Sequence, residues 1–258
     1  MAHTTYTGIL VTILAAALVA AQDLSLTIPP VRASFDIDHQ PVAITASGSI
    51  VRISDRGGEE TFRLRVTADL ADLQANITAI LRAQLDRSDR CGDRIAIQSA
   101  TLAPADPASL LTTRLHYERW ACVKALGKQI TSRLAGGDAL VKVKITPTVE
   151  ANRAVKLEPE VGEIQADGSL GELLGSGSLG DALRRKIRAS LESALEKGSA
   201  NLNAALPPAA QPYAAIRSAE FKDSGAGRLE VVLVGEIRIP SAEVPSLLDQ
   251  IKQRAASR

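Results

Sequence analysis

Aromatic residues are scarce in this chain, and charges of the two signs almost cancel. Only 3% of its 258 residues are Phe, Trp or Tyr, and 30 Lys and Arg stand against 29 Asp and Glu, for a net charge of +1. Nucleic-acid binders need a basic footprint on the phosphates, and single-strand binders also need aromatic stacking platforms. The composition therefore argues against nucleic acid as a partner.

Residues for catalysis and metal binding are also few. After the first 21 residues the only histidines are His39 and His116. A metal site needs several convergent ligands, and the Gly-x-Ser-x-Gly pattern of a hydrolase nucleophile is absent from the sequence. We expect no enzymatic activity, no cofactor and no metal. A periplasmic hydrolase with a site scattered along the sequence is kept as the third hypothesis.

Only one long apolar run occurs, and it stands at the start. Ile9 to Ala21 is too short to span a bilayer comfortably. It ends in Val19-Ala20-Ala21, which fits the small-residue rule for signal cleavage. We therefore expect residues 1–21 to be a signal peptide and the protein to be periplasmic or secreted. An uncleaved anchor is the alternative. The abundance of Ala and Arg indicates a bacterial source.

Cysteine is limited to Cys91 and Cys122, whose spacing matches no zinc site. In an exported chain an even count predicts a disulfide. Closing this loop stabilises by roughly 3–4 kcal/mol in the chain-entropy model. A pair of unpaired buried thiols is the alternative.

The most informative segment that is present runs from residue 179 to residue 239. Its apolar residues first recur at helical spacing, and Pro207 and Pro208 then end the helix. After a turn at 225–227, apolar residues alternate along a strand and point to one face. The helical stripe is Leu179, Leu183, Ile187, Leu191, Leu195 and Leu202, and the strand face is Leu229, Val231, Leu233, Ile237 and Ile239.

The rest of the chain alternates groups of strands with single helices. Strands precede a helix that Asp69 caps, with an apolar stripe up to Leu85. We expect a bulge near Ile50, a turn at 134–137, a Gly- and Ser-rich loop at 168–180 and a terminal helix near 244–255. Because strands and helices do not alternate singly, the pattern predicts an antiparallel α+β fold. Residues 22–258 are predicted as one domain with pseudo-halves at about 22–123 and 124–258.

This order resembles the tubular lipid-binding proteins, the superfamily of bactericidal permeability-increasing protein. The resembling segments are residues 69–85 with the stretch directly after them, and above all Ser178 through Ile239. The resemblance implies a long curved antiparallel sheet wrapped around one long and one shorter amphipathic helix, with a lipid between them. It also implies a disulfide from Cys91 to Cys122. The chain has the length of a single module.

On this interpretation we expect a non-enzymatic protein that binds or carries a lipid or another hydrophobic molecule. A structural or partner-binding protein of the cell envelope, with a filled core, is the alternative. The residues that we expect to line the ligand site are, in that alternative, simply part of the core. These residues are Ile77, Ile80, Leu81, Ile187, Leu191, Leu195, Val231 and Leu233.

Three polar features admit both a functional and an ordinary interpretation. The cluster Arg184, Arg185, Lys186 and Arg188 could touch an anionic membrane, although a solvated helix face with ion pairs is favoured. Gly175–Gly180 matches a dinucleotide-binding pattern without the strand that it needs. His116, Glu118, Trp120 and Cys122 alternate along one strand face, which we interpret as an ordinary polar face with Trp120 in the core.

Overall fold

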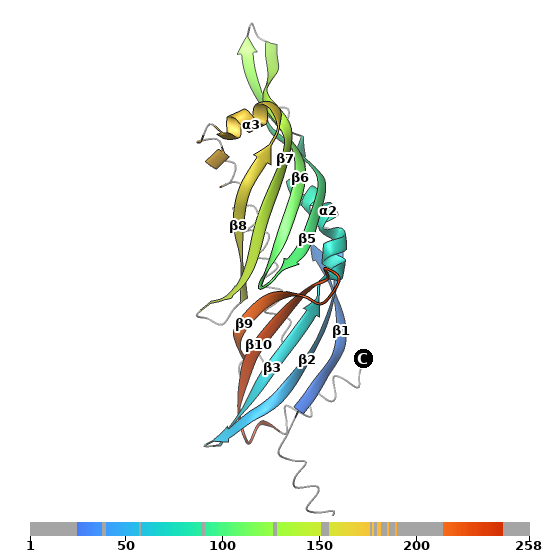
Figure 1. Ribbon diagram of the computed structural model, residues 1–258, viewed down its shortest axis with the longest axis vertical. Helices are drawn as coiled ribbons and strands as arrows, with labels where there is room; N and C mark the ends of the chain where they lie inside the picture. Colours follow the sequence, from blue (N-terminus) through green and yellow to red (C-terminus); the bar gives the residue numbers. More distant parts are fainter. Residues whose placement is uncertain are drawn as a thin grey trace, which may run out of the picture.

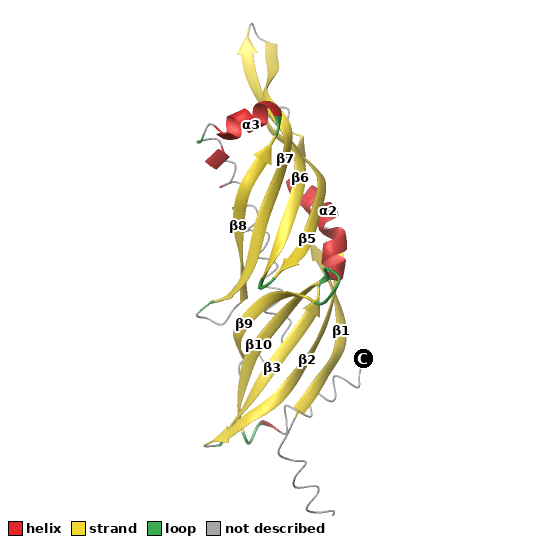
Figure 2. Cartoon of the chain, in the orientation of Figure 1, coloured by secondary structure: helices red, strands yellow, loops and turns green. Residues whose placement is uncertain are grey.

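A computed structural model describes residues 25–37, 40–56, 58–88, 91–125, 128–150, 155–175, 177, 180–181, 185, 189 and 214–244. These residues form two five-stranded antiparallel sheets that lie end to end along an elongated molecule (Figure 1). Strands predominate over helices (Figure 2). The predicted antiparallel sheet is confirmed as the dominant feature, although the strands make two sheets and not one, and the wrapping around a long helix stays a prediction.

Sheet A combines both ends of the described chain, and sheet B its middle. Sheet A has the order β1-β2-β3-β10-β9, with β1 Ser25–Ile37, β2 Gln40–Arg56, β3 Glu59–Asp69, β9 Ala214–Asp223 and β10 Leu229–Pro240. Sheet B has the order β4-β5-β6-β7-β8, with β4 Arg87–Ser88, β5 Gly92–Ala105, β6 Ala108–Ala125, β7 Lys128–Val149 and β8 Val155–Ala166. Because β6 and β7 are partners, no sheet boundary falls at residue 123, and the repeat of pseudo-halves stays a prediction.

The alternating pattern of β10 correctly predicts its buried face. Leu229, Val231, Leu233, Ile237 and Ile239 are all at most 8% exposed. The bulge expected near Ile50 in β2 lies slightly later, between Arg52 and Ser54. Alternation fixes the face of a strand because successive side chains point to opposite sides.

One apolar cluster joins the two sheets. It combines residues of β3, β9 and β10 in sheet A with residues of β5, β6, β7 and β8 in sheet B, and α2 (Ala71–Leu85) contributes as well. Hydrogen bonds also cross the junction. The N–H of Phe221 in β9 donates to the carbonyl of Pro107 at 2.8 Å, and the N–H of Asp223 donates to Oδ1 of Asp106 at 3.1 Å. The β5–β6 turn is thus fastened to the edge strand of sheet A.

Helix α2 covers the edge of β5 with its polar side chains. Thr78 Oγ1 donates to the carbonyl of Ala100 at 3.0 Å and accepts from its N–H at 2.9 Å. Arg82 Nε donates to the carbonyl of Ile97, whose own N–H donates to Asp86 Oδ1. An open strand edge leaves backbone groups without partners. Since β4 pairs with only the first part of β5, these side chains replace the missing strand.

The same helix is also tied to sheet A. Asp72 Oδ2 accepts the N–H of Ala43 in β2 at 2.6 Å, and Gln74 Oε1 accepts the N–H of Leu229 in β10 at 2.9 Å. At the start of the helix, Asp69 Oδ1 accepts the N–H of Ala71 at 2.8 Å, although Leu70 occupies the cap position itself. Helix α2 therefore links the two sheets by hydrogen bonds as well as by its apolar stripe.

The turn predicted at 134–137 is wrong, because β7 continues through it. The β6–β7 ladder accommodates these residues by a register shift, with Arg119 paired to Ala135 and Trp120 to Arg133. The two glycines of this segment let other groups approach the backbone of β7 closely. A Cβ on Gly137 would collide with the carbonyl of Asp167, and one on Gly136 with the Arg133 guanidinium.

The loop predicted at 168–180 is also wrong in its first part, which is helix α3 (Gly168–Gly175). Tertiary contacts outweigh the poor helix propensity of Gly and Ser. Leu170 is 0% exposed in a cluster with Tyr117 and Ala139. Ser169 Oγ accepts the N–H of Gly136 at 3.3 Å and donates to its carbonyl at 3.2 Å.

Most of the long helix expected after residue 179 lies outside the described residues. Gly180, Asp181, Arg185 and Ala189 are described and helical. The terminal helix expected near 244–255 also lies outside them, apart from Val244. Of the helices that the structure describes, none has the length and apolarity to cross a membrane.

Candidate functional site

The apolar interior is the first candidate for a functional site. Among the predicted lining residues, the structure brings Ile77 and Leu81 of α2 into one cluster with Val231 and Leu233 of β10. Ile80 is also buried, at 4% exposed. Ile187, Leu191 and Leu195 lie outside the described residues. Burial is shared by a solid core and by the lining of a groove, so ligand contact stays a prediction for all of them.

The apolar face extends beyond its buried centre. Partly buried aliphatic side chains pack around the cluster on both sheets, namely Ile44 and Val66 in sheet A and Leu115, Val149, Leu157, Val161 and Ile164 in sheet B. Polar side chains are rare inside. The buried polar residues that the structure describes are Ser109 and Thr113. Such a surface can bind aliphatic chains but offers few hydrogen bonds to a polar ligand.

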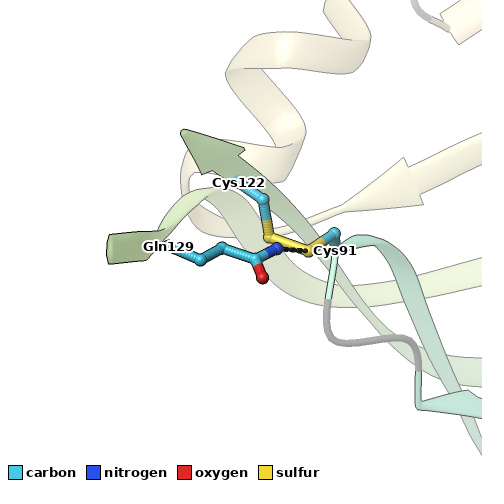
Figure 3. Close-up of a disulfide and its surroundings, with 3 residues drawn as sticks. All are labelled: Cys91, Cys122 and Gln129. Carbon is cyan, nitrogen blue, oxygen red and sulfur yellow. Dashed lines mark hydrogen bonds between the residues drawn. A yellow bond between two sulfur atoms is a disulfide. The ribbon is translucent and has the colours of Figure 1, made fainter. Parts of the chain in front are cut away.

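The predicted disulfide is present, and the alternative of two unpaired thiols is wrong. Cys91, directly before β5, is joined to Cys122 in β6 with Cα atoms 5.5 Å apart. Gln129 in β7 donates from Nε2 to Cys91 Sγ at 3.2 Å (Figure 3). The bond fastens the outer part of the β6–β7 hairpin to the neighbouring strand.

A polar cluster on sheet B is the second candidate. His116 Nδ1 lies 2.7 Å from Asp138 Oδ1, and its Nε2 lies 3.6 Å from Glu118 Oε1. Glu118 also accepts from Trp120 Nε1 at 2.9 Å and pairs with Arg133 at 3.3 Å. The shared strand face of His116, Glu118 and Trp120 agrees with the prediction. Asp138 and Arg133 could not be predicted, because their placement depends on the register of β7.

The electrostatics of this cluster favour charged carboxylates. The hydrogen bond from Trp120, with the charge of Arg133 and the contact to His116, lowers the pKa of Glu118. The hydrogen bond with His116 lowers the pKa of Asp138. Both ring nitrogens of His116 face carboxylates, whereas a general base needs one nitrogen directed at substrate. Within the described part of the chain, no group of three or more His, Cys, Asp and Glu side chains could hold a metal.

Trp120 belongs to this surface, so its predicted place in the core is wrong. It is only partly buried, and the guanidinium carbon of Arg94 lies 4.4 Å from the centre of its ring. A cation over the face of an indole ring is attracted by the ring quadrupole. The sequence carries no signal that separates this partly buried surface environment of Trp120 from a place in the core.

Tyr117 marks the limit of the interior on β6. It is 6% exposed, and its hydroxyl donates to Asp93 Oδ1 at 2.7 Å. Arg119, the next residue on that face, pairs with the same carboxylate. Burial, followed by the hydrogen bond and the charge of Asp93, raises the pKa of Tyr117 to about 12.

The remaining sequence motifs gain no support as sites. Arg185 is helical and exposed, whereas Arg184, Lys186 and Arg188 lie outside the described residues, so their membrane role stays a prediction. Gly175 ends helix α3. The glycine pattern that starts there therefore follows a helix, not the buried parallel strand of a dinucleotide site.

Comparison with known proteins does not change these assignments. No family model, no curated protein and no solved structure matches the chain, so its membership of the tubular lipid-binding proteins stays a prediction.

Proposed function

We propose that this protein binds a lipid, or another elongated hydrophobic molecule, against the apolar face that sheets A and B share. It would act outside the cytoplasm as a non-enzymatic carrier or store. The disulfide between Cys91 and Cys122 is compatible with an oxidising compartment. The resemblance to the tubular lipid-binding proteins supports the same function, with the long helix expected after residue 179 covering the ligand.

One observation carries the proposal: a single apolar cluster continues from β3, β9 and β10 through α2 into β5–β8, with a rim of aliphatic side chains that are only partly buried. Removing an acyl chain from water gains about 0.8 kcal/mol per methylene. A bilayer offers nearly the same gain. A protein can therefore exchange lipid with a bilayer only if its own surface is similarly apolar, and this face is aliphatic with few polar atoms.

The test is native mass spectrometry of the purified protein, followed by solvent extraction and identification of the released molecule. We expect a stoichiometric lipid, and uptake of a fluorescent fatty acid after delipidation. Repeated recovery of ligand-free protein that also takes up no fluorescent fatty acid would contradict the proposal. It would favour the alternative, a structural or partner-binding protein with a filled core.

A pair of variants tests the location. Leu157→Trp and Val161→Trp place a bulky ring on the partly buried rim of β8. We expect both to lower lipid stoichiometry while the protein remains folded by circular dichroism. Ile53→Trp is the matched control, because Ile53 is 42% exposed and lies outside the apolar cluster. If all three variants reduce binding equally, the ligand does not lie on the proposed face.

A further inference from the structure

Apolar side chains are exposed on the β6–β7 hairpin. Val123, Ile130 and Leu134 are 60%, 56% and 62% exposed, more than any other large hydrophobic side chain in the described ranges. Val123 and Ile130 are direct partners across the two strands. Figure 1 shows this hairpin extending past α3 and the rest of sheet B, at one end of the long axis. Exposed aliphatic side chains grouped on a projecting element indicate an interaction surface.

The charge of the same segment is of one sign. Residues 119–137 include Arg119, Lys124, Lys128 and Arg133 but no Asp or Glu, in a chain whose net charge is only +1. Arg119 and Arg133 pair with carboxylates at the inner part of the hairpin. The lysines belong to the outer part, where Lys124 is exposed near the end of β6 and Lys128 begins β7. The outer part therefore combines aliphatic and cationic residues.

The hairpin is held in place before it meets a partner. Cys122 lies directly beside Val123 and is bonded to Cys91 at the start of β5. Gln129, directly beside Ile130, donates to Cys91 Sγ. A prearranged surface loses little conformational entropy when it binds.

We propose that the outer part of the β6–β7 hairpin, defined by Val123, Lys124 and Ile130, docks on a bilayer that contains anionic lipid. The aliphatic pair enters the boundary between headgroups and acyl chains, and Lys124 contacts lipid phosphate. Interfacial binding elements combine buried apolar area with attraction to anionic headgroups. The patch is small, so the contact is weak, reversible and sensitive to salt. It does not depend on whether the protein carries lipid.

A second copy of the chain fits this surface less well. Two such hairpins placed against each other would bring two cationic segments together, and like charges in contact disfavour the complex. The anionic headgroups of a bilayer neutralise the same positive charge, and the bilayer also accepts the aliphatic side chains.

Trp120 supplies a built-in probe, since it is the only tryptophan of the chain and lies on the same hairpin. Energy transfer from Trp120 to a dansyl-labelled lipid measures docking directly. The full chain is titrated with vesicles of phosphatidylcholine and phosphatidylglycerol, and with vesicles of phosphatidylcholine alone. We expect transfer with the anionic vesicles, a much smaller signal with the neutral ones, and weakening as salt is raised.

The double variant Val123→Ser with Ile130→Ser tests the aliphatic part. We expect it to bind anionic vesicles about tenfold more weakly or worse, because both apolar contacts are lost. Val51→Ser with Ile53→Ser is the matched control. These aliphatic side chains are exposed too, at 39% and 42%, but they lie on β2 in sheet A. The control is expected to bind like the original chain, and the segment Ile9 to Ala21 is common to all variants.

A second variant, Lys124→Gln with Lys128→Gln, keeps the test decisive if the serine variant fails to fold. It is expected to lose the preference for anionic vesicles and most of the salt dependence. Unchanged binding by the hairpin variants would overturn the proposal, as would equal binding to both kinds of vesicle. It would also be overturned if the hairpin substitutions abolish a dimer in solution while vesicle binding is absent, since the occupant would then be a protein.

Discussion

The two ends of the β6–β7 ladder have similar chemistry and opposite surroundings. At one end Leu111 pairs with Val143, and these side chains are 3% and 1% exposed. At the other end Val123 pairs with Ile130, and these are 60% and 56% exposed. Strand alternation along β6 places Leu111 and Val123 on the same face of sheet B. The strand pattern is therefore the same in both places, and the neighbouring elements decide which pair is core.

The neighbours of the two ends differ. The inner pair belongs to the cluster to which α2, β9 and β10 contribute. The outer pair lies beyond the buried cluster of Tyr117, Ala139 and Leu170. An aliphatic side chain contributes to stability mainly by the surface that it removes from water. The inner end should therefore maintain the fold, while the outer end is available for other contacts.

Truncating one aliphatic side chain at each end of the ladder should give the largest difference in stability. Leu111→Ala removes a fully packed side chain, and we expect it to lower the free energy of unfolding by about 2–5 kcal/mol. Ile130→Ala is the matched substitution at the exposed end, and we expect a change within about 0.5 kcal/mol. Urea denaturation of both variants measures the difference.

An equal loss at both positions would break the comparison. It would mean that Ile130 is covered in solution by another part of the protein, and the proposed docking surface would then be closed.

Removing the disulfide should sharpen the comparison, because the outer end has little burial to hold it. Cys91→Ser with Cys122→Ser should lower the free energy of unfolding by up to about 3–4 kcal/mol in the chain-entropy model. Locally, we expect faster amide hydrogen exchange at the outer residues of β6 and β7, and little change around Leu111. Unchanged protection of the outer amides would show that the strand ladder alone holds the hairpin.

Local patterns predicted the faces of individual elements well. Alternation in β10 and the stripe of α2 correctly indicated which residues are buried, because both signals depend on neighbours along the chain. Those faces also explain the shared cluster of Ile77, Leu81, Val231 and Leu233, because an apolar helix stripe and an apolar strand face bury each other when they pack. Neither pattern determines whether a ligand lies between them.

Long-range features could not be predicted. The polar residues of α2 look like a solvated helix face, yet Thr78 and Arg82 bind the backbone of β5. The glycines of 134–137 look like a turn, yet Gly137 admits the backbone that leads into α3. In each case the deciding contact comes from a distant segment. The same holds for Asp138 beside His116, which requires the register after the irregularity at residue 134.

Tyr117 lies at the boundary between the buried and exposed ends of the β6–β7 ladder. Its titration should report how far water reaches that boundary. Its pKa is about 12 in the folded protein, against about 10 for an ordinary tyrosine. Above pH of about 10 the unfolded chain therefore loses this proton first, and proton loss favours unfolding. The stability contributed by the neutral phenol is complete below that pH and is lost as the pH rises toward the folded value.

Urea midpoints measured across this alkaline range should fall less steeply for Tyr117→Phe than for the original chain. Absorbance changes of phenolate, taken as the difference between the two proteins, give the pKa directly. Asp93→Asn separates the causes, because it removes the negative charge that opposes ionisation while the ring stays in place. Since burial is the largest single cause, this variant should lower the pKa of Tyr117 only part of the way toward its ordinary value. A full return to the ordinary value would mean that water reaches the ring, and the exposed end of the ladder would then begin before Tyr117.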